Sequence, residues 1–205
     1  MIQVPSIQAP LFSLSEQRFE LPGADLHYLP GFIPNEADWY RELSAMLVWH
    51  QDTIRVYGRE VLIPRLNAWY GDAEAVYSYS GLALEPQAWT SGLLELKRRV
   101  EKHVQRGFNS VLANWYRDGK DSVSWHADDE PELGSQPLIT SLSFGATRRF
   151  SLRRRDRQGK TVHIDLAGGS LLVMAGDTQR HWVHQVAKSS RCQSGRINLT
   201  FRQII

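Results

Sequence analysis

The sequence has a single cysteine, Cys192, among 205 residues, so a disulfide framework within the chain is excluded. It also lacks any apolar run near the roughly 20 residues that a membrane-spanning helix requires. Its N-terminus shows neither the basic nor the apolar region of a secretory signal. We therefore expect a monomeric protein of the reducing cytoplasm that does not associate with membranes. The 42% hydrophobic content is enough for one domain over residues 1–205.

The net charge is only +2, but the charged residues are unevenly distributed along the chain. Residues 1–105 carry nine Lys and Arg against thirteen Asp and Glu, whereas residues 106–205 carry fifteen against nine. A dense basic segment, opposed only by Asp156, contains Arg148, Arg149, Arg153, Arg154, Arg155, Arg157 and Lys160. Such a segment either attracts phosphates or forms a solvated hairpin whose charges prevent edge-to-edge aggregation. The sequence leaves both readings open.

Hydrophobic spacing divides the chain into two parts. Residues 34–48 and 90–104 have apolar side chains at helical spacing, which predicts two amphipathic helices packed on a sheet. Short strands are predicted at 110–116, 138–144, 149–153, 161–166, 170–174, 182–187 and 196–202. The fold class is therefore α+β, mainly β, as a sandwich or jelly roll. Residues 1–20 are expected to form a loose arm.

Strand periodicity places several polar side chains on common faces. One face of the predicted strand 196–202 carries Arg196, Asn198, Thr200 and Arg202. Two guanidinium groups on one face can each grip a carboxylate, which suits a dicarboxylate ligand. Asn114 and Tyr116 share a face of 110–116 and can hydrogen-bond the same acid. The alternative for 196–202 is an outer strand with scattered charges. The alternative for Asn114 and Tyr116 is that they only form hydrogen bonds within the protein core.

Two histidines and an aspartate form a candidate metal site. His126 and Asp128 are two positions apart (i, i+2), so in extended backbone they project to the same side. His181 and His184 compete to be the third ligand, and a regular strand cannot point both at one metal. His184 is favoured because it lies in an apolar stretch. Two imidazoles and one carboxylate are the facial triad of non-haem Fe(II) oxygenases.

These motifs together resemble the AlkB family of Fe(II)/2-oxoglutarate-dependent dioxygenases. The similarity rests on His126-x-Asp128, His184, Arg196-x-Asn198-x-x-x-Arg202 and Asn114-x-Tyr116. Further similarity at Ile63-Pro64-Arg65, Tyr70-Gly71-Asp72 and residues 77–81 indicates the human DNA-repair homologue 2 branch as the nearest. The resemblance covers residues 25–205.

The resemblance implies a double-stranded β-helix (jelly-roll) core at 106–205, flanking N-terminal helices and a nucleotide-recognition lid at 50–85. It implies that His126, Asp128 and His184 hold Fe(II). It further implies that 2-oxoglutarate is bound at one end by Arg202 with Asn114 and at the other by Arg196 with Tyr116, next to Asn198 and Thr200. The implied reaction is oxidative demethylation of alkylated DNA bases such as 1-methyladenine and 3-methylcytosine, with formaldehyde, succinate and CO2 as products.

The resemblance also suggests how a base is held, because a methyl on the pairing edge is reachable only after the nucleotide is flipped out of the duplex. The implied base contacts are Tyr77, Tyr79, Asp129, Glu130 and Arg65, and the implied gap-filling loop contains Tyr57, Gly58 and Arg59. Spacing alone also permits two tyrosines packed on a core and acidic groups that only orient metal ligands. Alternative functions are an RNA demethylase, a protein or small-molecule hydroxylase of the same superfamily, and a catalytically silent nucleic-acid-binding module.

Overall fold

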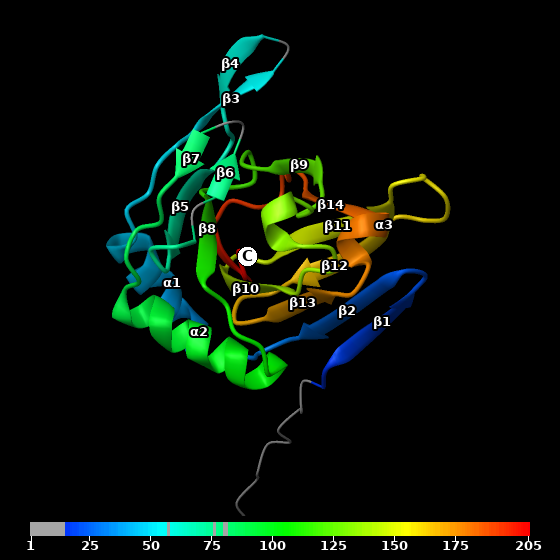
Figure 1. Ribbon diagram of the computed structural model, residues 1–205, viewed down its shortest axis with the longest axis horizontal. Coiled ribbons are helices and arrows are strands. Elements are labelled where there is room, and N and C mark those ends of the chain that lie inside the picture. The colour runs from blue at the N-terminus through cyan, green and yellow to red at the C-terminus, as the bar shows by residue number, and fades with distance from the viewer. Residues whose placement is uncertain (1–14, 57, 76, 80–81) are drawn as a thin grey trace, which may run out of the picture.

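The computed structural model describes residues 15–56, 58–75, 77–79 and 82–205. Its side chains are described outside 55–57 and 76–84. Two antiparallel sheets face each other (Figure 1). The larger sheet consists, in spatial order, of β1 (Gln17–Leu21), β2 (Ala24–Leu29), β13 (Leu171–Ala175), β10 (Ile139–Gly145), β15 (Arg196–Arg202), β8 (Ser110–Tyr116) and β5 (Leu66–Gly71).

The remaining elements form the second sheet, two hairpins and the helices. The smaller sheet consists of β12 (Val162–Leu166), β11 (Arg148–Arg154), β14 (Trp182–Val186) and β9 (Val123–His126). The hairpins are β3 (Thr53–Val56) with β4 (Arg59–Leu62), and β6 (Tyr77–Tyr79) with β7 (Leu82–Leu84). The helices are α1 (Glu36–Met46), α2 (Ser91–Val104), α3 (Thr178–His181) and a 3-10 turn at Pro131–Leu133. Both long helices and all seven strands expected after residue 109 are present, and the jelly-roll fold class is confirmed.

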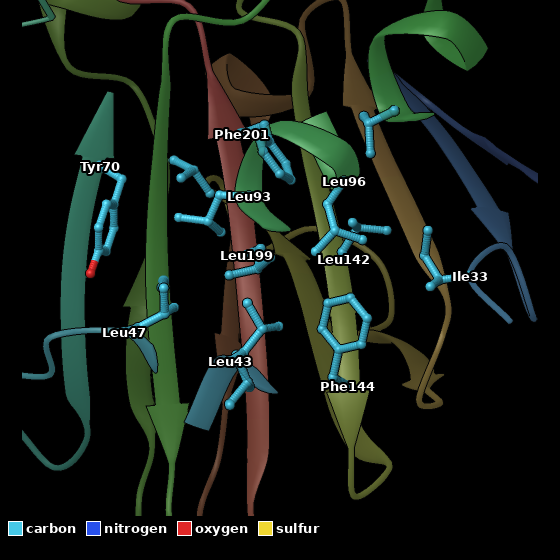
Figure 2. Packing of buried hydrophobic residues seen from close by; sticks show 14 of the residues in the cluster. Ile33, Leu43, Leu47, Tyr70, Leu93, Leu96, Leu142, Phe144, Leu199 and Phe201 are labelled. Atoms are coloured by element: carbon cyan, nitrogen blue, oxygen red, sulfur yellow. The ribbon is translucent and has the colours of Figure 1, made fainter. Parts of the chain in front are cut away.

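Helices α1 and α2 cover the outer face of the larger sheet. Leu93 and Leu96 of α2 pack into the same cluster as Leu199 and Phe201 of β15 (Figure 2). Helix α2 starts at the cap residue Thr90, whose Oγ1 accepts a hydrogen bond from the backbone N–H of Leu93 at 3.2 Å. The apolar side of β15 is therefore buried under helices.

The opposite side of β15 faces the smaller sheet. A second hydrophobic cluster fills much of this inner space, with Leu152 of β11 and Leu172 of β13 both fully buried. On this inner side β15 presents its polar face, and every residue of the strand is buried. The alternative of an outer strand with scattered charges is thus wrong, because β15 lies between β10 and β8.

Three boundaries expected from the sequence are corrected by the strand pairing. The arm expected at residues 1–20 is too long, because β1 begins at Gln17 and pairs with β2; residues 1–14 lie outside the described residues. The core expected at 106–205 also contains β1, β2 and β5. Strand β5 had been placed in the lid at 50–85, yet it pairs with β8 along its whole length.

Besides β5, the segment expected to form the lid contains two hairpins, β3–β4 and β6–β7. Hairpin β3–β4 projects away from the two sheets (Figure 1), and all four residues of β4 are exposed. At its base the N–H of Ile63 donates to the carbonyl of Asp52 at 2.8 Å. None of the described helices is long and apolar enough to cross a membrane.

Candidate active site

The three candidate metal ligands converge at one point between the sheets. His126, Asp128 and His184 each offer a ligand atom, and these atoms lie within 4.8 Å of one another. His126 and His184 are directly opposite in the β9–β14 pair, so the antiparallel ladder brings both imidazoles to the same side. Of the competing histidines, the structure therefore brings His184 to the site, as expected, and leaves His181 in α3.

Neighbouring groups orient both imidazoles. The Nδ1 of His126 lies 2.8 Å from the carbonyl oxygen of Ser124, which makes Nδ1 the protonated nitrogen and leaves Nε2 to bind a metal. The His184 ring stacks on Phe150, with 5.0 Å between centroids, and lies edge-on to His126 at 4.3 Å. The rings therefore present defined nitrogens to a common point.

The two buried ligands have the protonation states that metal binding requires. Burial alone would raise the pKa of Asp128, but Arg202 and the two histidines outweigh it and hold that pKa at about 2. The Nη2 of Arg202 donates to Oδ1 of Asp128 at 2.7 Å. Burial, followed by the charge of His126, lowers the pKa of His184 to about 3. At neutral pH the site thus offers a carboxylate and a neutral imidazole, the forms that bind Fe(II).

The residues expected to bind 2-oxoglutarate are held in register across two strands. Arg196 of β15 is directly opposite Tyr116 of β8, and Asn198 is opposite Asn114. The guanidinium carbon of Arg196 lies 5.5 Å from the centroid of the Tyr116 ring. Directly opposite residues of an antiparallel pair share a face, so these side chains all point into the space between the sheets.

Arg196 provides the test of whether this site fits an acid. It is 1% exposed, and its Nη2 donates to the Ser143 hydroxyl at 2.9 Å. Its Nε and Nη1 have no hydrogen-bond partner among the described residues. Burial lowers the pKa of Arg196 to about 10, which still leaves it cationic at neutral pH. A buried cation with unpaired donors is costly, so the residues present fit a ligand carboxylate.

Strand β10 supplies two serines that sequence reasoning missed. Ser143 accepts from Arg196, and Ser141 accepts from Asn198 at 2.6 Å. The Oδ1 of Asn198 in turn accepts from the Thr200 hydroxyl at 3.0 Å. The signal was available, because Ser141 and Ser143 alternate with apolar residues and so share a strand face. Each of the two serines thus holds one polar side chain of β15, Ser143 that of Arg196 and Ser141 that of Asn198.

A single cavity of about 560 Å³ joins the metal ligands to the co-substrate residues. Its lining includes the triad, Arg196, Arg202 and Glu130, and its outer part includes His50, Asp52 and Glu85 near the hairpins. Arg65, expected to contact substrate, also lines the cavity, and its Nε donates to Oδ1 of Asn114 at 2.7 Å. This bond orients the Asn114 amide so that Nδ2 remains as the donor toward a ligand.

Apart from Arg65 and Glu130, the residues expected to contact substrate are not among the described residues that line this cavity. Arg59 is exposed on β4, and Gly58 adopts φ +78° at the hairpin turn, a conformation that suits glycine. Tyr57 and the side chains of Tyr77 and Tyr79 lie outside the described residues. Asp129 is not among the described residues lining the cavity, because its carboxylate pairs with Arg155.

The basic segment does not form one phosphate-binding face. Arg148 is 2% exposed and donates to the carbonyls of Asp118, Asp121 and Ala187 at 2.8–3.0 Å. Four of the other cations each contact a different partner, which is Asp165 for Arg149, Trp125 for Arg153, Asp156 for Arg154 and Asp129 for Arg155. The shared phosphate role is therefore wrong for Arg148, since successive residues of β11 point to opposite sides of the sheet.

Comparison with known proteins agrees with this site. The model of the 2OG-Fe(II) oxygenase superfamily matches residues 25–202. The Mus musculus protein named alpha-ketoglutarate-dependent dioxygenase alkB homolog 3 is 46% identical over 189 residues, which cover 85% of this chain and 64% of that protein. The chain thus spans less than two thirds of the length of that relative.

Two further relatives refine the placement. The Mus musculus DNA oxidative demethylase ALKBH2 is 42% identical over 194 residues, covering 89% of this chain and 81% of that protein. The solved structure titled "The structure of OsALKBH1" shares the fold with a TM-score of 0.63 at 19% identity, over 91% of this chain and 100% of that one. The expectation that the homologue 2 branch is nearest is corrected, because alkB homolog 3 matches at higher identity. The chain belongs to the 2OG-Fe(II) oxygenase superfamily and, within it, to the AlkB family, whose cofactor and co-substrate are Fe(II) and 2-oxoglutarate.

Proposed function

We propose that this chain is an oxidative demethylase of N-alkylated DNA bases of the 1-methyladenine and 3-methylcytosine type. One observation carries the proposal: a single cavity contains the His126–Asp128–His184 triad and both arginines of β15, and its outer part lies beside the hairpins. The name of the relative ALKBH2, DNA oxidative demethylase, supports the same reaction. The cavity volume falls within the roughly 300–1,000 Å³ of small-molecule and cofactor sites.

The proposed reaction is balanced without any further reductant. Fe(II) and 2-oxoglutarate, when bound, supply the oxidation, in which O2 converts the methyl to a hydroxymethyl group while 2-oxoglutarate becomes succinate and CO2. The hydroxymethyl carbon then leaves as formaldehyde, and the unmodified base remains. The chain contributes the ligands and holds the reacting groups in place.

Two arginines of β15 divide the work of holding the dicarboxylate. Arg196, opposite Tyr116, binds the carboxylate far from the metal, because its Nε and Nη1 have no other partner among the described residues. Arg202, with Asn114, binds the carboxylate near the metal, since Arg202 already contacts the metal ligand Asp128. The two guanidiniums thereby set the direction in which the acid lies.

The substrate base enters from the side of the hairpins. Hairpin β3–β4, with Tyr57, Gly58 and Arg59, occupies the gap that the flipped nucleotide leaves in the duplex. Tyr77 and Tyr79 stack on the flipped base, and the carboxylates of Asp129 and Glu130 accept from its exocyclic amine. Of these carboxylates, Glu130 lines the cavity, whereas Asp129 reaches the base only by exchanging its pairing with Arg155.

A formaldehyde assay on matched oligonucleotides tests the proposal. The Fe(II)-loaded protein is given 2-oxoglutarate and one sequence as single-stranded DNA, duplex DNA or RNA, with 1-methyladenine, 3-methylcytosine or the unmodified base at one position. Formaldehyde is expected from methylated DNA and not from the unmodified controls. A larger kcat/KM on RNA would make RNA the substrate. Succinate formation stimulated by peptides or amino acids, without release from any oligonucleotide, would indicate a hydroxylase of another substrate class.

A further inference from the structure

We infer that Gln179 is a positioning residue that fixes the metal ligand Asp128 and the loop that carries it. The inference rests on the metal-binding part of the proposed function and is independent of which substrate is used. Gln179 is 2% exposed and is not among the described residues that line the active-site cavity. It therefore acts through another residue and not by touching substrate.

The three metal ligands are not fixed in the same way. His126 and His184 are opposite each other in the β9–β14 ladder, so strand pairing sets the relation between them. Asp128 lies two residues beyond His126, where β9 has already ended. Its backbone is thus outside the ladder, and a facial triad needs the carboxylate held as firmly as the imidazoles.

Gln179 holds this loop at two successive positions. Its side-chain Oε1 accepts a hydrogen bond from the backbone N–H of Asp128 at 3.0 Å, with both residues buried. Its backbone carbonyl accepts from Nη2 of Arg155 at 3.0 Å, and the same Nη2 pairs with Asp129. A hydrogen bond to a buried backbone N–H is costly to lose, because the orphaned donor has no access to water.

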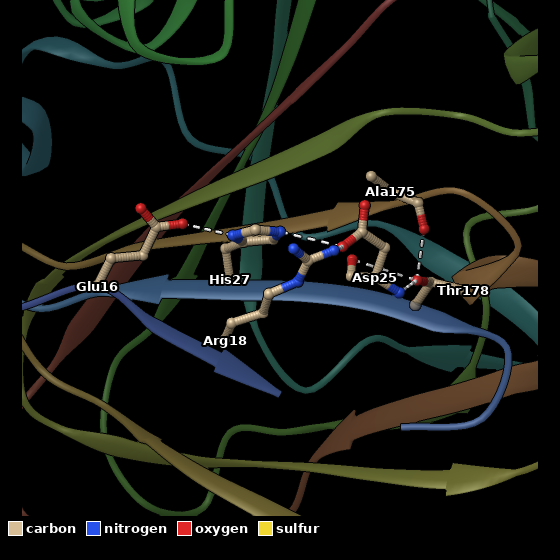
Figure 3. Close-up of polar contacts among 6 residues, drawn as sticks. All are labelled: Glu16, Arg18, Asp25, His27, Ala175 and Thr178. Carbon is tan, nitrogen blue, oxygen red and sulfur yellow. Dashed lines mark hydrogen bonds and ion pairs between the residues drawn. The ribbon is translucent and has the colours of Figure 1, made fainter. Parts of the chain in front are cut away.

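Gln179 can serve as an anchor because the short helix α3 is itself fixed. The hydroxyl of Thr178 donates to the carbonyl of Ala175 at 2.6 Å and accepts from the backbone N–H of Asp25 at 2.9 Å (Figure 3). The indole Nε1 of Trp182 donates to the carbonyl of Pro22 at 3.1 Å. The β1–β2 hairpin thus forms hydrogen bonds with the first residue of α3 and with the residue that follows its last.

The same segment also connects two metal ligands. His184 follows α3 on β14, five positions after Gln179 in the chain. Gln179 therefore joins the segment that carries His184 to the loop that carries Asp128. A displacement of this side chain would change the position of the carboxylate relative to the imidazoles, and with it the affinity for the metal.

The test is a measurement of metal affinity that needs no turnover. Gln179→Met keeps a side chain of similar length but removes the acceptor, and Co(II) alone is titrated while its d–d absorption is recorded. We expect the apparent Kd for Co(II) to rise about tenfold, as for other residues that orient metal ligands, and the Co(II) spectrum to change. Arg180→Ala, an exposed neighbour on the same helix, is the matched control and should keep the wild-type Kd within about twofold.

A folded Gln179→Met protein with the wild-type Kd and spectrum would overturn the inference. Should that variant not fold, Gln179→Asn replaces it, because it keeps a buried amide but withdraws the acceptor by one methylene group. The same rise in Kd is expected for Gln179→Asn, and a wild-type value would again overturn the inference. A wild-type protein that binds Co(II) but releases no formaldehyde from methylated DNA would count only against the proposed substrate. A wild-type protein that binds no Co(II) would remove the metal centre and the inference together.

Discussion

At the scale of single residues, the two arginines of β15 differ in what they touch. Arg202 forms an ion pair with Asp128, and the two side chains are about equally buried at 8% and 6% exposure. Arg196 contacts Ser143 and faces Tyr116, away from the triad. Under the proposed function, Arg202 therefore couples the metal ligand to the acid-binding site, whereas Arg196 serves the acid alone. Variants at the two positions should have separable effects.

Replacing Asp128 should abolish turnover, because Asp128→Ala removes the anionic ligand of the proposed Fe(II) site. Its carboxylate is buried, so the affinity for methylated DNA, measured by fluorescence anisotropy, should stay close to wild type. Asp165→Ala removes an exposed carboxylate of β12 and is the control. Formaldehyde release that persists in a folded Asp128→Ala protein would refute the metal assignment.

Replacing Arg196 should chiefly raise the KM for 2-oxoglutarate. Arg196→Met removes donors that have no partner among the described residues. A hydrogen bond to a charged group contributes about 1.5–3 kcal/mol, so KM should rise roughly 10- to 100-fold. The Kd for Co(II) should not change. Arg202→Met should alter both constants, since Arg202 also contacts Asp128. Equal effects of the two variants on Co(II) affinity would contradict this division.

At the scale of elements, β11 shows why a run of like charges is ambiguous. Its first two residues, Arg148 and Arg149, are adjacent in sequence but lie on opposite sides of the sheet. Arg148 is inside, where three carbonyl oxygens accept from its guanidinium. Arg149 is outside and pairs with Asp165. Charge composition counts both alike, and only the strand register distinguishes a structural cation from a surface one.

This difference predicts unequal effects on stability. Arg148→Met leaves three carbonyl groups without their donor and should lower the free energy of unfolding by on the order of 3 kcal/mol. Arg149→Met breaks only a solvent-exposed ion pair, and the free energy of unfolding should change far less, because water and salt screen such a pair. Urea unfolding of both variants measures the difference. Equal losses would mean that Arg148 does not have the structural role assigned to it.

At the scale of the whole molecule, helices and strands with a repeating hydrophobic pattern could be predicted from the sequence, whereas the role of a single residue without such a pattern could not. Hydrophobic spacing predicted helix 34–48, observed at Glu36–Met46, and strand 196–202, observed unchanged, because amphipathic elements repeat along the chain. Strand β5 was missed as part of the sheet, since it is buried without strict alternation. Gln179 was missed because one buried amide leaves no spacing pattern, and its role depends on a partner 51 positions away.

The whole fold should report ligand binding as a change in thermal stability. A ligand that binds only the native state at 100 times its Kd adds about 2.7 kcal/mol, which for a domain of this size raises Tm by roughly 5–10 °C. Mn(II) with 2-oxoglutarate should therefore raise Tm more than Mn(II) alone. In the Arg196→Met protein, the rise in Tm caused by 2-oxoglutarate should largely disappear, whereas the rise caused by Mn(II) should remain. The reason is that the residue proposed to bind the carboxylate is not one of the proposed metal ligands. Arg149→Met should keep both increments. A full 2-oxoglutarate increment in Arg196→Met would show that the acid is held elsewhere in the cavity.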